Sequence, residues 1–161
     1  MAFVAITNSK GNLPFIYNVD MAVGTSAANK RDDVMLVQYC LKHIWANPTK
    51  FNPPLPSPPS GEMKVDGFCG PTTRRWIVEW QFMSRKRGHN VTTDGLVDKA
   101  RGSFQSSISK TDYHIVKLNA ALKRARPDLF KNIFLDPDAP AELKLAVGLV
   151  ITPDSEESPG F

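Results

Sequence analysis

The sequence has few of the residues from which metal sites and disulfide frameworks are built. It contains two cysteines, Cys40 and Cys69, which form neither a C-x-x-C pair nor any other ligand-spaced set. Both lie among apolar neighbours, so two interpretations stay open: buried free thiols that act as small hydrophobic side chains, or a disulfide between them. The histidines His43, His89 and His114 lie on separate segments without H-x-H or H-x-x-x-H spacing. We therefore expect no metal and no cofactor.

Long hydrophobic runs are also missing. No segment reaches the roughly 18 to 20 apolar residues of a membrane span. Residues 1–20 lack the basic start and the apolar stretch of a secretory signal. We expect a protein that is made in the cytoplasm without an encoded signal peptide, and that would reach the periplasm or the cell wall by another route if its target lies there.

The charge balance is only slightly basic. Twenty Lys and Arg face 16 Asp and Glu, which gives a net charge of +4, and no basic run is long enough to form a tail. This balance favours contact with anionic polymers without deciding which one. The chain has 161 residues, 42% of them hydrophobic, so it can bury a core of its own as one domain or as one domain with a small appendage.

Two segments have the pattern of amphipathic helices. Apolar residues recur at helical spacing over residues 30–45, where Asn29 is the expected N-cap. A second amphipathic helix is expected over residues 71–87, because Pro71 suits the first position of a helix and Gly88 suits the position after its end. These two helices are the expected centre of the fold.

The remaining segments are shorter or less regular. Residues 96–104 are compatible with a third, shorter helix, and further helices are expected over residues 111–126, capped by Thr111 or Asp112, and over residues 138–148. Residues 1–28 favour either two short strands around a turn or an extended arm. Six prolines between residues 47 and 61 exclude a helix or a central strand there, so this segment is a Pro-rich insertion.

Two Asp-Gly turns alternate with the two expected helices in a fixed order. The first helix carries Asp33-Val34 and Val37-Gln38, the turn at residues 66–73 reads DGFCGPTT, the second helix carries Trp76-Ile77 and Trp80-Gln81, and the second turn at residues 94–97 reads DGLV. In order and spacing, these blocks resemble the first repeat of the peptidoglycan-binding-like family. The family pattern is a D-V helix with L-Q, a D-G-x-F-G-P-x-T turn, an A-V-x-x-F-Q helix and a second D-G-x-V turn.

The resemblance implies a mostly α-helical protein built on a compact three-helix module of the peptidoglycan-binding-like type at residues 29–108. Within that module, residues 47–61 form the Pro-rich insertion. Outside it we expect a short extended N-terminal arm at residues 1–28, a C-terminal helical extension at residues 109–150 and a flexible tail at residues 151–161.

The sequence departs from the family pattern at several positions. Cys69 stands where the family usually has Phe, Trp76 stands where it has a small Ala, and Asp98-Lys99 replace the Gly-Pro after the second turn. The Pro-rich insertion replaces a short connection. These changes alter the pocket and its edge, so glycan binding can be lost while the fold is kept.

Most of the matching residues have a structural explanation. An Asp-Gly pair makes a tight turn whose carboxylate accepts backbone N–H groups, Phe68 or Cys69 plugs the core, and Gly-Pro-Thr begins the next helix. These positions specify the fold before they specify a ligand. The residues of this structural motif are Asp33, Val34, Gln38, Asp66, Gly67, Gly70, Pro71, Gln81, Asp94 and Gly95.

The candidate ligand-binding residues surround the first Asp-Gly turn, in a shallow groove between the first two helices. A muropeptide offers amides, carboxylates and sugar hydroxyls, which suit an aromatic floor, Thr hydroxyls and Arg side chains. Trp76 and Trp80 lie four residues apart on one helix face, so both also fit a core position. The candidates are Phe68, Thr72, Thr73, Arg74, Arg75 and Trp76.

The sequence contains no recognisable catalytic set. Glu62, Glu79 and Glu142 lie in a Pro-rich segment, a helix and a terminal helix, without the context of a muramidase carboxylate pair. Family members are often noncatalytic modules attached to an enzyme, and no catalytic domain is recognisable here. We therefore expect a noncatalytic protein that binds bacterial peptidoglycan or a muropeptide.

Two other functions stay open. The chain can be a protein-interaction or structural component, of a phage particle or a contractile injection apparatus, that reuses the fold as a scaffold and meets a protein partner through the Pro-rich insertion or the C-terminal helices. The minor alternative is nucleic-acid binding by a basic helix surface. That surface consists of Arg74, Arg75, Arg85, Lys86 and Arg87.

Overall fold

The computed structural model describes residues 1–7, 13–102, 105–106 and 110–148, and it confirms the expected mostly helical fold. The described α-helices are α1 (Arg31–Trp45), α2 (Pro71–Lys86), α3 (His114–Ala125), α4 (Pro127–Lys131) and α5 (Ala141–Gly148). The short 3-10 helices are η1 (Pro48–Lys50) and η2 (Ile133–Leu135). The strands are β1 (Phe3–Ile6), β2 (Phe15–Asn18), β3 (Val23–Gly24) and β4 (Leu96–Val97).

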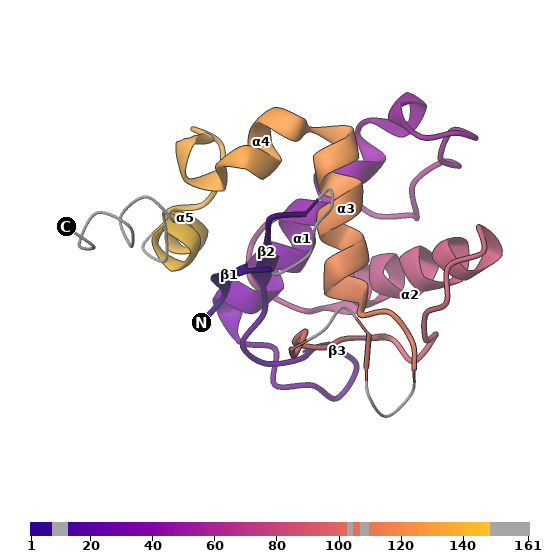
Figure 1. Ribbon diagram of the computed structural model, residues 1–161, viewed down its shortest axis with the longest axis horizontal. Helices are drawn as coiled ribbons and strands as arrows, with labels where there is room; N and C mark the ends of the chain where they lie inside the picture. The colour runs from indigo at the N-terminus through magenta and orange to yellow at the C-terminus, as the bar shows by residue number, and fades with distance from the viewer. Residues whose placement is uncertain (8–12, 103–104, 107–109, 149–161) are drawn as a thin grey trace.

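Helix α1 runs through the middle of the molecule, where it packs against α2, α3 and α5 (Figure 1). Its apolar residues Val34, Leu36, Val37, Leu41 and Ile44 are each at most 1% exposed. A helix that is buried around most of its circumference is one that other elements cover on several sides. The apolar sequence of α1 therefore makes it the centre of the core.

The start of α1 corrects the expectation that Asn29 is its N-cap. Asn29 has a positive φ of 51°, and its side chain accepts a hydrogen bond from the Gly24 N–H and donates one to the Gly24 carbonyl. The helix begins later, at Arg31, after Lys30, whose side chain makes no capping hydrogen bond. The Asn29 side chain is satisfied by the loop before the helix, so it closes that loop instead of capping α1.

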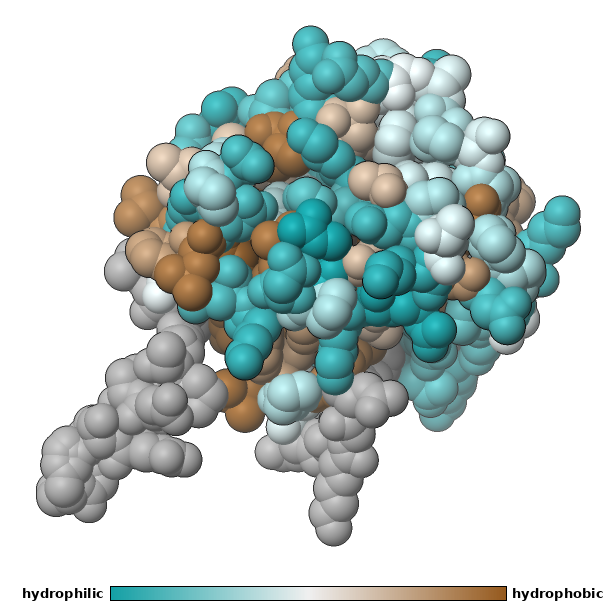
Figure 2. All heavy atoms as spheres, turned by 90° about the horizontal axis from the view of Figure 1, so that it is seen from above, coloured by the Kyte–Doolittle hydropathy of each residue, from teal (hydrophilic) through white to brown (hydrophobic). Residues whose placement is uncertain are grey.

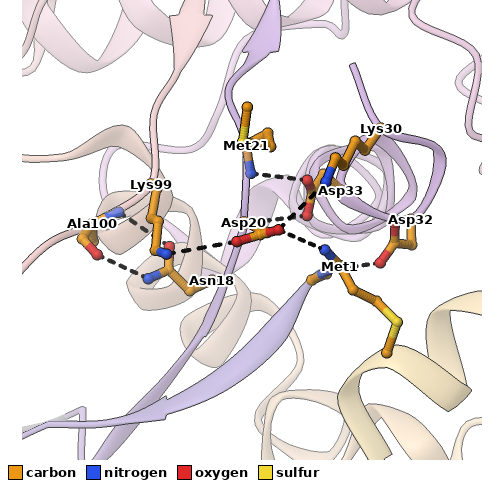
Figure 3. Close-up of polar contacts among 10 residues, drawn as sticks. Met1, Asn18, Asp20, Met21, Lys30, Asp32, Asp33, Lys99 and Ala100 are labelled. Atoms are coloured by element: carbon orange, nitrogen blue, oxygen red, sulfur yellow. Dashed lines mark hydrogen bonds and ion pairs between the residues drawn. The ribbon is translucent and has the colours of Figure 1, made fainter. Parts of the chain in front are cut away.

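The two carboxylates in the first turn of α1 hold the N-terminal segment in place (Figure 3). The buried Asp33 accepts hydrogen bonds from the backbone N–H of Asp20 at 2.9 Å and of Met21 at 3.0 Å. Burial raises the pKa of Asp33 in spite of these two bonds. Asp32 accepts from the Ala2 N–H at 2.6 Å. Asp20 in turn lies 2.9 Å from the N-terminal amine, which lowers the pKa of its carboxyl group.

The third helix expected over residues 96–104 is wrong. Leu96–Val97 forms strand β4, which pairs antiparallel with β3, and Phe104 lies outside the described residues. The Asn18 side chain donates to the Ala100 carbonyl at 3.0 Å and accepts from the Ala100 N–H at 3.1 Å (Figure 3). Because these backbone groups are bound to a distant side chain, they cannot enter a helical hydrogen-bond ladder.

The other expected helices are present. Helix α2 begins at Pro71, and Gly88 follows its end with a φ of 93°, a conformation that suits glycine after a helix. Helix α5 ends at Gly148 as expected, but it begins at Ala141, after Pro140, later than the expected start at residue 138. Helix α3 also lies where it was expected, but its N-cap residue is Tyr113, so the expected capping by Thr111 or Asp112 is wrong.

The N-terminal segment is a β-hairpin that joins the core, which confirms the two-strand alternative. Strands β1 and β2 are antiparallel, with Phe3 opposite Asn18. Asn119 of α3 accepts from the Tyr17 N–H and donates to the Tyr17 carbonyl, both at 2.8 Å. The Tyr17 hydroxyl donates to the Phe130 carbonyl at 2.8 Å. The hairpin is thus tied to both α3 and α4.

The two cysteines are free thiols, which decides between the two interpretations left open by the sequence. Cys40 is completely buried in α1, and burial raises its pKa to about 12. Cys69 is partly buried beside the first Asp-Gly turn.

None of the helices in the described residues has the length and apolar character needed to cross a membrane. The expectation of a flexible tail at residues 151–161 lies outside the described part of the chain.

Candidate functional site

The first Asp-Gly turn is fixed by the buried side chain of Gln38, which reaches across from α1. Its Oε1 accepts hydrogen bonds from the Asp66 N–H at 3.0 Å and the Gly67 N–H at 2.9 Å. Its Nε2 lies 3.0 Å from three acceptors, the Asp66 carboxylate, the Phe68 carbonyl and the Thr73 hydroxyl. One amide side chain therefore binds both sides of the turn and the first turn of α2. We call this arrangement the Gln38 clamp.

The second Asp-Gly turn is fixed in the same way from α2. The Oε1 of Gln81 accepts from the Gly95 N–H at 2.7 Å, and its Nε2 donates to the Leu96 carbonyl at 2.9 Å and to the Asp94 carboxylate at 3.5 Å. Gln38 is 1% exposed and Gln81 is fully buried. Both turns thus use a buried Gln from the preceding helix, and we call the second arrangement the Gln81 clamp.

Each turn also needs its own Asp and Gly. The Asp66 carboxylate accepts from the Phe68 N–H at 2.9 Å, and Asp94 makes the same bond to the Leu96 N–H at 3.0 Å. Partial burial raises the pKa of Asp66, but its hydrogen bonds from Phe68 and Gln38 outweigh this effect and leave the pKa below its usual range. Gly67 has a φ of 78°, and a Cβ atom there would lie 3.0 Å from a backbone carbonyl oxygen of α1, so only glycine fits.

Four of the six candidate ligand-binding residues are accessible at the surface of this turn. Phe68 is 69% exposed, which corrects the alternative that it plugs the core. Its ring covers Gly70 at the start of α2. Arg74 and Arg75 are exposed on the first turns of α2, and Thr72 is half-buried. We call the set of Phe68, Thr72, Arg74 and Arg75 the turn surface.

The other two candidates, Thr73 and Trp76, face the interior. Thr73 is 4% exposed and accepts from Gln38, and Trp76 is 6% exposed and donates from its indole nitrogen to the Ser60 carbonyl at 3.4 Å. The Trp76 ring also meets Trp45 edge-on, with 5.4 Å between the ring centroids. Both side chains therefore support the turn surface from below, and the end of the Pro-rich insertion packs against Trp76.

Side chains that could ligate a metal ion do not gather in the part of the chain that the structure describes. No group of three or more His, Cys, Asp and Glu side chains there could hold a metal ion. The His43 ring packs on Tyr39 with 4.4 Å between centroids, and the Nε2 of His114 lies 2.7 Å from the Thr92 carbonyl. These two histidines have structural contacts.

A separate pocket of about 1110 Å³ lies away from the turn surface, between the Pro-rich insertion, the second half of α2 and α3. The sequence pattern of one segment could not reveal it, because its walls are distant in sequence: residues 51–56, residues 80–89 and residues 117–124. The sequence of each helix, taken separately, did contain a sign of the basic rim of this pocket. Basic residues gather at the ends of both α2 and α3.

Comparisons of the chain with protein-family models, with curated proteins and with solved structures found no match.

Proposed function

We propose that this protein binds bacterial cell-wall peptidoglycan or muropeptides without catalysing a reaction, and that the turn surface makes the contact. The observation that carries the proposal is the position of Phe68. This aromatic ring is 69% exposed on a turn that the Gln38 clamp holds rigidly, directly before the two arginines of α2.

The chemistry of the turn surface suits a glycopeptide. A large aromatic side chain contributes about 1.5–3 kcal/mol to folding when it is buried, and Phe68 forgoes most of this stabilisation. An exposed ring offers a flat apolar face to a sugar ring, and Arg74 and Arg75 offer paired N–H donors to the carboxylates of the stem peptide. Thr72 adds a hydroxyl group at the edge. A rigid turn adds affinity because little conformational entropy is lost on binding.

The test is sedimentation of the folded protein with insoluble peptidoglycan sacculi at low and moderate salt. Wild type should pellet with the sacculi, while Phe68→Ala and the double variant Arg74→Gln/Arg75→Gln should each bind at least about tenfold more weakly, a loss of about 1.4 kcal/mol. The matched control is Phe82→Ala, which removes a 56% exposed phenylalanine from α2, outside the turn surface.

Two results would overturn the proposal. One is that folded wild-type protein stays in the supernatant at both salt concentrations. The other is that Phe82→Ala weakens binding as much as Phe68→Ala does, because the effect would then follow from the general loss of apolar surface. Circular dichroism of each variant establishes that it is folded.

A second function, as a scaffold that binds another protein, is favoured by an exposed apolar patch on η2 and α5. Phe134, Leu135 and Leu145 on η2 and α5 are 47%, 72% and 56% exposed. In Figure 2, brown hydrophobic atoms gather on the left, the side on which Figure 1 places α5. Exposed apolar side chains that cluster in this way are typical of protein contacts. Recovery of a stoichiometric partner that Leu135→Ser/Leu145→Ser no longer binds would support this function over the first.

A further inference from the structure

The pocket of about 1110 Å³ has three walls that approach one another only in the folded protein, and Leu13 of the N-terminal segment also contributes to its lining. In Figure 1 the Pro-rich insertion lies at the upper right, above α2 and beside the upper end of α3. The resemblance blocks contribute only the α2 wall. The other two walls belong to the Pro-rich insertion and to α3, so the pocket lies mostly outside those blocks.

The inner part of the pocket is apolar. Phe51 and Leu55 line it from the Pro-rich insertion, Trp80 and Met83 from α2, and Ala121 from α3. Trp80 and Leu55 are only 5% and 7% exposed, so they form its base, while Phe51 and Met83 are half-buried. Ligand pockets are commonly apolar inside and polar at a few positions on the rim.

The rim of the pocket is strongly basic. Its lining includes five Lys and Arg side chains and one histidine, and none of its described lining residues is acidic. These five cations exceed the net charge of the whole chain, which is +4, so the remaining residues carry a slight net negative charge. The cations of this rim are Lys86, Arg87, Lys117, Lys123 and Arg124.

The charges converge from opposite walls. Lys86 and Arg87 end α2, and Arg124 ends α3 on the other side; Lys86 and Arg124 are both exposed. Burial and the nearby charges of Lys117 and Arg87 lower the pKa of His89, although Asp112 opposes them. Asp112 lies 3.2 Å from Lys117 and neutralises part of its charge. Lys86, Arg87 and Arg124 give the rim of the pocket a positive potential.

The pocket is preformed. The Nη2 of Arg87 donates to the Pro54 carbonyl at 2.9 Å, which ties the Pro-rich insertion to the end of α2. The Leu55 N–H donates to the Pro48 carbonyl at 3.1 Å. Proline has a fixed φ, so this wall loses little conformational entropy when a ligand binds.

We propose that this pocket is a second ligand site, distinct from the turn surface, and that it takes an elongated ligand with an apolar body and two or more carboxylate or phosphate groups. The apolar body contacts Trp80 and Met83. One anionic group binds Lys86 on the α2 wall, and another binds Arg124 on the α3 wall.

The test uses bis-ANS, an apolar fluorescent dye with two sulfonates, and the folded full chain. Energy transfer from tryptophan to the dye reports binding close to the cluster of Trp45, Trp76 and Trp80, and the variants locate the dye within that region. The double variant Lys86→Gln/Arg124→Gln should bind the dye roughly tenfold more weakly than wild type, which corresponds to about 1.4 kcal/mol. Ala120→Phe, at an exposed lining position, should also weaken binding because the ring fills the pocket and leaves every charge in place. The matched control is Arg74→Gln/Arg75→Gln, which removes two charges outside the pocket.

Competitors identify the anionic group. If pyrophosphate is the only competitor that displaces the dye, the proposal is supported and the anionic groups of the ligand are phosphates. If citrate and a Glu-Glu dipeptide displace it, the proposal is supported and the anionic groups are carboxylates. If none of the three competitors displaces the dye, or if folded Lys86→Gln/Arg124→Gln and Ala120→Phe bind it as tightly as wild type, the proposal is wrong. Binding to sacculi should be unchanged in Ala120→Phe, so the two proposals can fail separately.

Discussion

Replacement of Gln38 by Met tests whether the clamp stabilises the fold. Methionine has a similar length and volume but no hydrogen-bonding amide, so the change removes all five hydrogen bonds of Gln38 and leaves no cavity. A typical hydrogen bond contributes about 1 kcal/mol net. Asp66 and Phe68 are exposed, so water can replace part of what is lost. We expect the free energy of unfolding to fall by about 3 kcal/mol.

Gln81→Met gives the internal comparison. Gln81 makes three hydrogen bonds, of which the one to Asp94 is long at 3.5 Å, so the expected loss is about 1.5 kcal/mol. Lys42→Met, at an exposed position of α1, is the control and should change stability by less than about 0.5 kcal/mol. The size of the effect should therefore follow the number of bonds in each clamp.

Urea unfolding followed by circular dichroism measures all three variants, with the slope of the transition checked for constancy. For a chain of this size, a loss of 3 kcal/mol corresponds to a fall of roughly 6–12 °C in melting temperature. The reasoning is refuted if Gln38→Met loses less than about 1 kcal/mol, or if it is more stable than Gln81→Met.

Three further predictions concern the interior. Asn119→Ala removes three buried hydrogen bonds, two of them to Tyr17, and should lower the free energy of unfolding by about 2–4 kcal/mol, measured by urea unfolding; a smaller loss than 1 kcal/mol would contradict this. A thiol reagent should modify only Cys69 in the native protein and also Cys40 after unfolding in urea, because the buried thiol is inaccessible and its pKa is raised to about 12; two fast-reacting native thiols would contradict it. Burial lowers the pKa of His114 below its value of about 6.5 in the unfolded chain. The free energy of unfolding should therefore fall as the pH falls below about 6.5, and His114→Gln should reduce this pH dependence in melting experiments. An unchanged pH dependence would count against this prediction.

The sequence was most informative where one segment carried its own signal. Pro71 and Gly88 predict the ends of α2, and the structure places both at those ends. Apolar spacing likewise predicts α1 and α5. Such signals depend on residues a few positions apart, so they can be interpreted without knowledge of the tertiary structure.

Features that depend on distant residues could not be predicted. The segment around Ala100 is apolar enough for a helix, but Asn18, 82 positions earlier, binds its backbone groups. Asn is a favoured residue at the N-cap, but the Asn29 side chain accepts a hydrogen bond from the Gly24 N–H instead. The pocket combines three segments, and the exposure of Phe68 results from the way the first turn packs. Each of these outcomes is decided by tertiary contacts that local patterns do not contain.

The burial of α1 on several sides has a practical consequence for anyone who wishes to transplant the region that resembles a binding module. A fragment limited to residues 29–108 would lose α3 and α5, both of which pack against α1, and part of the buried apolar surface of α1 would become exposed. Such a fragment would expose apolar side chains along α1, and we expect it to aggregate or to dimerise. The β1–β2 hairpin and the C-terminal helices are therefore needed to cover the core, and any fusion or display of this protein has to include them.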